Sequence, residues 1–216
     1  MVSTSITSPM VYNEIDPRKQ AFVFELDNVL YPEKDYLLQV YYLFATFLEY
    51  TEMLDAKAML NVMTVAYEEY GHEGVFDALQ KEFNIDIKYA QNFQILLGNA
   101  KLPLKLLLYQ QMLDLMQEIV IDRKKLFIVT NGNPQQQLNK IRQIEWHGLE
   151  QYLICYFANE YAAKPEPDAI HTLIHEHNLQ RRDLVMIGNI KTDELSAEAS
   201  GIDYINAGSF INTSSK

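Results

Sequence analysis

The sequence predicts an α/β fold, in which a doubly wound, mostly parallel sheet is interrupted after its first strand by an all-helical insert. Three observations lead to this prediction. The apolar run at residues 21–26 is rich in aromatic and β-branched residues, as in a buried strand. Residues 34–119 carry helical spacing of apolar residues and no convincing strand. From residue 125 onwards, strand and helix patterns alternate, which is typical of a parallel sheet.

The helical stretch divides into four expected helices. They cover residues 36–49, 56–70, 74–83 and 104–119, with breaks at Gly71, Gly98 and Pro103. Residues 33–105 are therefore expected to form an inserted helical domain. The α/β core is expected at residues 19–32 and 106–210.

The alternating part of the chain supplies the remaining strands and helices. The expected strands are residues 125–130, 154–157, 184–187 and 204–205, and the expected helices are residues 135–144, 167–177 and 192–200. Pro134 suits the first position of a helix, and Gly201 suits the position just past a helix end.

The composition narrows the classes of function. The chain has 216 residues and a formal net charge of -11, which would repel nucleic acid. Cys155 is the single cysteine, so no intrachain disulfide can form. We find no signal-peptide pattern and no apolar run long enough to span a bilayer, so a cytoplasmic protein without a membrane partner is expected. The sequence does not indicate an oligomeric state.

Polar side chains stand at the carboxyl ends of the predicted strands, where ligands bind in open α/β sheets. These residues are Glu25, Asp27, Thr130, Asn131, Lys164, Asn189 and Asp193. Phosphoryl transfer uses such a set, because a carboxylate can attack phosphorus, a lysine can neutralise phosphate oxygens and acidic oxygens can hold Mg²⁺.

Four short motifs, in order along the chain, carry a resemblance to a known family. Residues 24–32 read FELDNVLYP, residues 130–132 read TNG, residues 164–167 read KPEP and residues 188–193 read GNIKTD. Together they resemble the four motifs of the haloacid dehalogenase-like (HAD) hydrolases over roughly residues 20 to 208. The helical insert resembles the cap domain that many members carry after the first motif.

The resemblance implies a role for each residue and a substrate class. Glu25 stands at the nucleophile position, and Asp27 would be the general acid/base and give its backbone carbonyl to the metal. Thr130, Asn131 and Lys164 would bind the substrate, and Lys164 would also steady the nucleophile. Glu25, Asp27, Asn189 and Asp193 would form the Mg²⁺ site. The implied partner is a small phosphorylated metabolite, hydrolysed as a phosphomonoester.

This sequence departs from the family pattern at two of these positions. Glutamate replaces aspartate at position 25, and a carboxylate displaced by about an ångström can lower a rate by ~10²-fold. Asn189 replaces the metal-binding aspartate, so a neutral amide oxygen stands where a charged ligand is usual. The preferred function is a HAD-type hydrolase that acts on a small phosphorylated metabolite with Mg²⁺, and the alternative is a non-catalytic member that binds a phosphorylated ligand or a protein.

Other interpretations fit the sequence less well. In a shifted register Asp27 would be the nucleophile, but Val29 would then stand at the acid/base position. Metal-independent dehalogenation would leave Asp193 without a metal role, and the large insert disfavours a response-regulator-like signalling domain. His171 and His175 are spaced as zinc ligands on a helix, but they fall opposite its apolar face and are expected on a solvated surface.

Overall fold

The computed structural model describes residues 9–211, which form two compact units. The sheet unit comprises the described residues up to Pro32, Leu107–Pro134 and the described residues from Glu145 onwards. The helical unit comprises Glu33–Leu106 and Gln135–Ile144. The chain therefore leaves the sheet unit twice, once after the first strand and once after Pro134.

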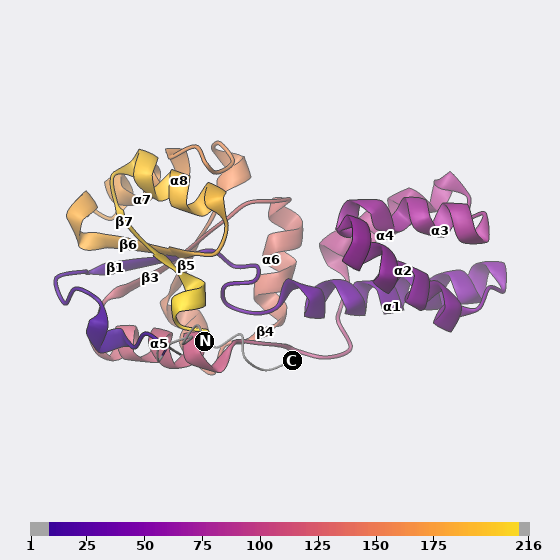
Figure 1. Cartoon of the computed structure of the whole chain (residues 1–216), viewed down its shortest axis with the longest axis horizontal. Helices are drawn as coiled ribbons and strands as arrows, with labels where there is room; N and C mark the ends of the chain where they lie inside the picture. Colours follow the sequence, from indigo (N-terminus) through magenta and orange to yellow (C-terminus); the bar gives the residue numbers. More distant parts are fainter. Residues whose placement is uncertain (1–8, 212–216) are drawn as a thin grey trace, which may run out of the picture. The chain divides into compact units, whose positions relative to one another are not determined.

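A five-stranded parallel sheet forms the centre of the sheet unit (Figure 1). Its strands, in the order β5-β3-β1-β6-β7, are Leu153–Phe157, Lys125–Thr130, Ala21–Phe24, Leu184–Gly188 and Asp203–Asn206. All four neighbouring pairs run parallel. Phe24 at the end of β1 is aligned with Ile128 of β3 and Ile187 of β6, so the carboxyl ends of these strands lie at one edge of the sheet.

Helices cover both faces of this sheet. In Figure 1, α7 (Asp168–Glu176) and α8 (Lys191–Ser200) lie over one face, and α5 (Gln110–Ile121) lies over the other. The four residues of β1 are buried on both faces, which explains their uninterrupted apolar pattern. One part of the core is formed by Val23, Phe127, Met186, Ile170, Leu173 and Ala197, which all pack in one cluster.

The helical unit contains α1 (Glu33–Glu52), α2 (Ala56–Tyr70), α3 (Val75–Phe83), α4 (Ala90–Asn99) and nearly all of α6 (Pro134–Gln143). An aromatic cluster packs α1, α3 and α4 together: Phe44 lies 4.8 Å from Phe93 and 6.3 Å from Phe76, between ring centroids. Buried aromatic side chains contribute large apolar areas, so this cluster is the core of the unit.

Helix α6 is attached to the helical unit by polar side chains. Asn139 Nδ2 donates to the Tyr36 hydroxyl at 3.2 Å, and Gln143 Oε1 accepts from the backbone N–H of Leu102 at 2.9 Å. The buried Lys140 donates to Glu33 at 2.9 Å. The expected boundaries placed this helix in the α/β core, because the contacts that attach it to the helical unit are made by polar side chains, which sequence spacing does not reveal.

Three further elements differ from the sequence-based expectation. Helix α4 was not predicted, because its apolar pattern is short and Gly98 suggested a break. The helix expected from residue 104 begins at Gln110, and the preceding β2 (Leu106–Leu107) pairs with β4 (Ile144–Glu145) in a two-stranded sheet.

The short 3₁₀ helices are Tyr12–Glu14, His72–Gly74, Ile87–Tyr89, Leu149–Tyr152, Ala158–Glu160, Arg181–Asp183 and Ala207–Ser209. Among the described residues, no helix combines the length and the apolar character needed to cross a membrane.

Candidate active site

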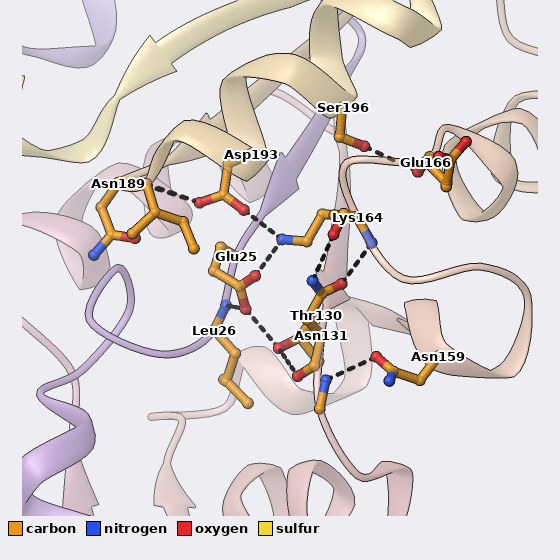
Figure 2. Close-up of polar contacts among 12 residues, drawn as sticks. Glu25, Leu26, Thr130, Asn131, Asn159, Lys164, Glu166, Asn189, Asp193 and Ser196 are labelled. Carbon is orange, nitrogen blue, oxygen red and sulfur yellow. Dashed lines mark hydrogen bonds and ion pairs between the residues drawn. The ribbon is translucent and has the colours of Figure 1, made fainter. Parts of the chain in front are cut away.

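Glu25 lies just beyond β1 with both carboxylate oxygens engaged by hydrogen-bond donors (Figure 2). Its Oε1 accepts from the backbone N–H of Leu26 at 2.7 Å and from the Thr130 hydroxyl at 2.5 Å. Its Oε2 accepts from the Lys164 ammonium. Only 6% of Glu25 is exposed, so its carboxylate is held mainly by protein groups.

Lys164 joins Glu25 to a second buried carboxylate. Its Nζ also donates to Asp193 Oδ1 at 2.5 Å, and the side chains of Lys164 and Asp193 are 1% and 0% exposed. Buried charges are tolerated when they are paired and hydrogen-bonded. Two carboxylates here share one ammonium, so the fully ionised group of three carries one net negative charge.

The second oxygen of Asp193 closes the start of α8. Asp193 Oδ2 accepts from the backbone N–H groups of Asn189 at 3.1 Å and Ile190 at 3.3 Å. These N–H groups have no partner within the helix, and the helix dipole favours a negative charge at this end. Gly188 leaves room for the carboxylate, since a Cβ there would lie 2.7 Å from Asp193 Oδ2.

Asn131 holds the backbone of Lys164 rather than pointing to open space (Figure 2). Its Oδ1 accepts from the Lys164 N–H at 2.8 Å, and its Nδ2 donates to the Lys164 carbonyl at 3.0 Å. Asn159 Oδ1 accepts from the next backbone N–H, that of Gly132, at 2.8 Å. The predicted substrate-binding role of Asn131 stays untested, and its observed contacts position Lys164.

Burial and neighbouring charge shift the titration of the two partners. Burial raises the pKa of Glu25 and Asp193 raises it further, while Lys164 and its hydrogen bond act in the opposite direction. Burial acts to lower the pKa of Lys164, but the charges of Glu25 and Asp193 outweigh burial and raise it. The lysine therefore stays protonated between the two carboxylates.

Asp27 and Asn189 lie in the loops that follow β1 and β6. The Tyr31 hydroxyl donates to Asp27 Oδ1 at 2.7 Å, within the turn that ends the first motif. Asn189 Nδ2 donates to the backbone carbonyl of Asn28 at 3.2 Å. The amide of Asn189 thus ties together the two loops beside Glu25.

Comparison with known proteins agrees with this geometry. The family model described as haloacid dehalogenase-like hydrolase matches residues 22–207, which is most of the chain. The protein belongs to the haloacid dehalogenase-like hydrolases. All the strand-end residues discussed above fall inside the matched range.

Solved structures of hydrolases are similar to this chain in fold, at low sequence identity. A hydrolase from Streptococcus pneumoniae TIGR4 superimposes with a TM-score of 0.52 at 15% identity, covering 87% of this chain and 92% of that one. A HAD-superfamily hydrolase from Geobacter sulfurreducens also gives 0.52 at 15% identity, covering 87% and 86%. Such identities establish the shared fold alone.

One curated sequence is similar over a shorter stretch. A phosphoglycolate phosphatase from Photobacterium profundum is 33% identical over 75 residues, or 34% of this chain. The match spans 31% of the length of that relative, so it is evidence for kinship and leaves the activity open.

Within the HAD framework, the structure brings together four of the predicted site residues. Glu25, Thr130, Lys164 and Asp193 form one continuous hydrogen-bonded network, although they come from four separate segments of the chain. Strand alignment explains this convergence, since parallel strands end at the same edge. The catalytic and substrate-binding roles assigned to Glu25, Asp27, Thr130 and Lys164 stay predictions.

The expected Mg²⁺ site can be compared with the donors present. Mg²⁺ prefers carboxylate and carbonyl oxygens in near-octahedral geometry. Here both oxygens of Glu25 and both of Asp193 already accept from N–H or O–H donors. Within residues 9–211, no group of three or more His, Cys, Asp or Glu side chains could hold a metal ion. In this arrangement the carboxylates of Glu25 and Asp193 are engaged by protein donors, and a magnesium site formed by these two residues with Asp27 and Asn189 stays a prediction.

Sequence reasoning missed three residues that shape the HAD site. Gly188 was assigned to the fourth motif, but the space that it leaves for the Asp193 side chain was not predicted. Tyr31 and Asn159 were not predicted to hold Asp27 and Gly132. Tyr31 could have been found, because a tyrosine four residues after an aspartate in a tight turn can reach back to it. Asn159 carried no local signal.

Proposed function

We propose that this chain is a HAD-fold binding protein that does not hydrolyse phosphomonoesters. The observation that carries the proposal is the position of the Glu25 carboxylate. It accepts from the Thr130 hydroxyl and the Lys164 ammonium, the two groups that the family resemblance assigns to substrate phosphate. A carboxylate that already occupies these donors opposes a phosphate group placed in the same position.

The longer side chain of glutamate explains this occupancy. One additional methylene carries the carboxylate away from β1 and toward Thr130 and Lys164, where Oε1 also meets the Leu26 N–H. A nucleophile needs an unobstructed approach to the reacting atom, and a displacement of ~1 Å can lower a rate by ~10²-fold. With 6% of Glu25 exposed, little of the carboxylate faces a substrate.

The metal-binding positions support the same conclusion. Asn189 provides a neutral amide whose Nδ2 donates a hydrogen bond to the Asn28 carbonyl. The Asp193 carboxylate accepts hydrogen bonds from Lys164 and from two backbone N–H groups. Lys164 pairs with both Glu25 and Asp193 and supplies one positive charge to the two carboxylates. A side chain of the protein itself therefore balances part of the negative charge that a metal ion would balance.

A second candidate is Mg²⁺-dependent hydrolysis of a small phosphorylated metabolite. The similarity to a phosphoglycolate phosphatase favours it, as does the retention of Asp27, Thr130, Lys164 and Asp193 at their motif positions. In this case Glu25 would have to leave Thr130 and Lys164 when substrate binds, and the helical insert would serve as a cap that excludes water.

A phosphatase assay with engineered motif residues separates the two candidates. The full chain, its Glu25→Asp variant and the double variant Glu25→Asp/Asn189→Asp are each assayed with Mg²⁺ on 2-phosphoglycolate and p-nitrophenyl phosphate. We expect wild type to match a protein-free blank and the double variant to gain activity. Adding Asp27→Asn to the double variant serves as the control, because it should abolish any activity that arises in this site.

Turnover by wild type would overturn the proposal if Glu25→Gln or Asp27→Asn abolished it. That result would establish the hydrolase, with Glu25 as a working nucleophile. An inactive wild type together with an active double variant would support the binding protein, since the rest of the catalytic arrangement would be shown to be intact.

A further inference from the structure

A cavity of about 480 Å³ opens on the surface of the sheet unit, and none of the groups that hold Glu25 lines it. Residues 9–12, which precede β1, form one wall, and the outer face of α5 forms the other. Binding cavities for small molecules have volumes of roughly 300–1,000 Å³. The cavity therefore has room for a small organic molecule.

The wall that precedes β1 is held in place by protein contacts. The backbone N–H of Met10 donates to the Ser209 carbonyl at 2.7 Å, and the Tyr12 hydroxyl donates to Asp122 Oδ2 at 2.6 Å. Asp122 directly follows the last residue of α5, so the second contact joins the two walls. The cavity is therefore formed before a ligand enters, and a ligand does not have to order the wall.

The apolar surface that a ligand can reach is aliphatic and lies on the wall before β1. Val11 is 55% exposed, and Pro9 and Met10 are half-buried. Leu115 and Phe210 are buried and close the floor of the cavity. An alkyl chain laid against residues 9–11 would remove this apolar surface from water without entering the core.

The wall formed by α5 carries negative charge. Asp114 and Glu118 are one helical turn apart, both are exposed, and neither forms an ion pair with a described residue. Glu118 lies in the last turn of α5, which contains no basic residue, and the negative end of the helix dipole adds to its charge. Among the described residues that line the cavity, none is a cation.

The nearest cation is directed to other partners. Lys124 Nζ lies 5.2 Å from the centroid of the Tyr12 ring and donates to the Pro17 carbonyl at 3.2 Å. Its charge is offset by Asp122, which is bonded to Tyr12. The carboxylates of α5 therefore determine the charge that the cavity prefers, and the net charge of -11 on the whole chain acts in the same direction.

We propose that this cavity binds a primary aliphatic amine. The ammonium group pairs with Glu118 and Asp114, and the alkyl chain lies against Val11 and Met10. The proposal goes beyond the proposed function and does not depend on it, because the cavity does not involve Glu25. The phosphatase assay and an amine titration therefore give separate answers.

Titration of the full chain, followed by chemical-shift changes in NMR, tests this site with four matched compounds. The probe is hexylamine, and hexanol, hexanoate and butylamine change its charge or its length. We expect hexylamine to bind most tightly and hexanoate not to bind. Hexanol should bind about 2- to 5-fold more weakly, the value of an exposed ion pair. Butylamine, which lacks two methylenes, should bind about 10-fold more weakly.

Variants separate the charged wall from the apolar wall. The double variant Asp114→Asn/Glu118→Gln should lower the affinity for hexylamine to that for hexanol and leave the affinity for hexanol unchanged. Val11→Ser should weaken both compounds alike, by about 4-fold. Glu198→Gln is the matched control and should change neither affinity, because Glu198 is exposed on α8, which lies over the opposite face of the sheet from α5 (Figure 1).

Three results would overturn the proposal. Hexylamine might produce no chemical-shift change, or hexanoate might bind as tightly as hexylamine. In the third, Asp114→Asn/Glu118→Gln would retain the preference for hexylamine over hexanol, or Glu198→Gln would lose it to the same extent. The last outcome would attribute the preference to the net charge of the chain instead of to this cavity.

Discussion

Gly188 and Asp193 are in such close contact that a Cβ on the glycine would lie 2.5 Å from the Cβ of the aspartate. Gly188→Ala should therefore displace the buried carboxylate from Lys164 and from the start of α8. Overpacking of this kind destabilises a protein by roughly 1–3 kcal/mol. Urea unfolding followed by the fluorescence of Trp146, the single tryptophan, measures the change, because this residue is buried in the sheet unit.

Gly98→Ala is the matched control for that experiment. The nearest atom to a Cβ at Gly98 is Gln135 Cγ at 3.6 Å, an ordinary contact, and the residue lies within α4. Replacing glycine by alanine inside a helix stabilises by roughly 0.5–1 kcal/mol. Similar losses of stability in the two variants would show that the contact with Asp193 is not the cause.

Removing the ammonium of Lys164 should have a much larger effect. Lys164→Met leaves Glu25 and Asp193 buried without their shared cation, and loss of one partner of a buried ion pair destabilises by about 3–5 kcal/mol. Lys140→Met tests the specificity of this effect. Lys140 is equally buried, but its partner Glu33 has 28% of its side chain exposed, so water can solvate the carboxylate left behind. In thermal unfolding at pH 8, the Tm of Lys164→Met should therefore lie well below the Tm of Lys140→Met. The reverse order would contradict the account in which Glu25 and Asp193 share the ammonium of Lys164.

Asn131 and Asn159 differ in how many of their amide atoms are used. Asn131 uses both its oxygen and its nitrogen on the backbone of Lys164, whereas the bond from Gly132 uses only the oxygen of Asn159. Asn131→Asp should therefore destabilise by about 1–3 kcal/mol, since a carboxylate would face the Lys164 carbonyl without a donor. Asn159→Asp keeps its acceptor and should stay within about 0.5 kcal/mol of wild type. Chemical unfolding at pH 7.5 compares them, and equal effects would argue against the two-point contact.

The raised pKa of Glu25 predicts how stability changes with pH. A carboxyl group whose pKa is raised above its ordinary value of 4.5 by burial, and further by Asp193, binds a proton more tightly in the folded state than in the unfolded state. Its contribution to the free energy of unfolding is fully present below about pH 4.5 and is lost as the pH rises through the folded pKa.

Glu25→Gln removes this titration. The stability of the variant relative to wild type should rise as the pH increases above the ordinary carboxyl pKa of 4.5, because the wild-type carboxyl then loses its proton. Urea midpoints measured at several pH values provide the comparison. A pH-independent difference between the two proteins would mean that Glu25 titrates alike in both states.

The sheet and the network around Lys164 were predictable because their signals are local. Apolar strands and the polar residues at their ends can be read from short segments, and parallel alignment then brings Glu25, Thr130, Lys164 and Asp193 together. Two properties of Glu25 could not be predicted: the direction of its carboxylate and its complete set of donors. Both depend on side-chain conformation after folding, and sequence spacing does not specify it.

The contacts of α6 were also beyond prediction, for a different reason. Asn139, Lys140 and Gln143 bind residues that are between 39 and 107 positions distant in the chain, through polar groups that leave no apolar period. Long-range polar packing of this kind becomes visible only once the elements are assembled.

Because α6 belongs to the helical unit, one continuous deletion or fragment of the chain cannot contain that whole unit without also containing part of the sheet unit. Deleting residues 33–106 as one continuous block would remove Glu33 and Tyr36, which accept hydrogen bonds from Lys140 and Asn139 of α6. An isolated fragment 33–106 would lack the same helix. A minimal folding module should therefore be made by joining α6 to that fragment through a designed linker. Both stretches of the helical unit would then lie on one continuous polypeptide.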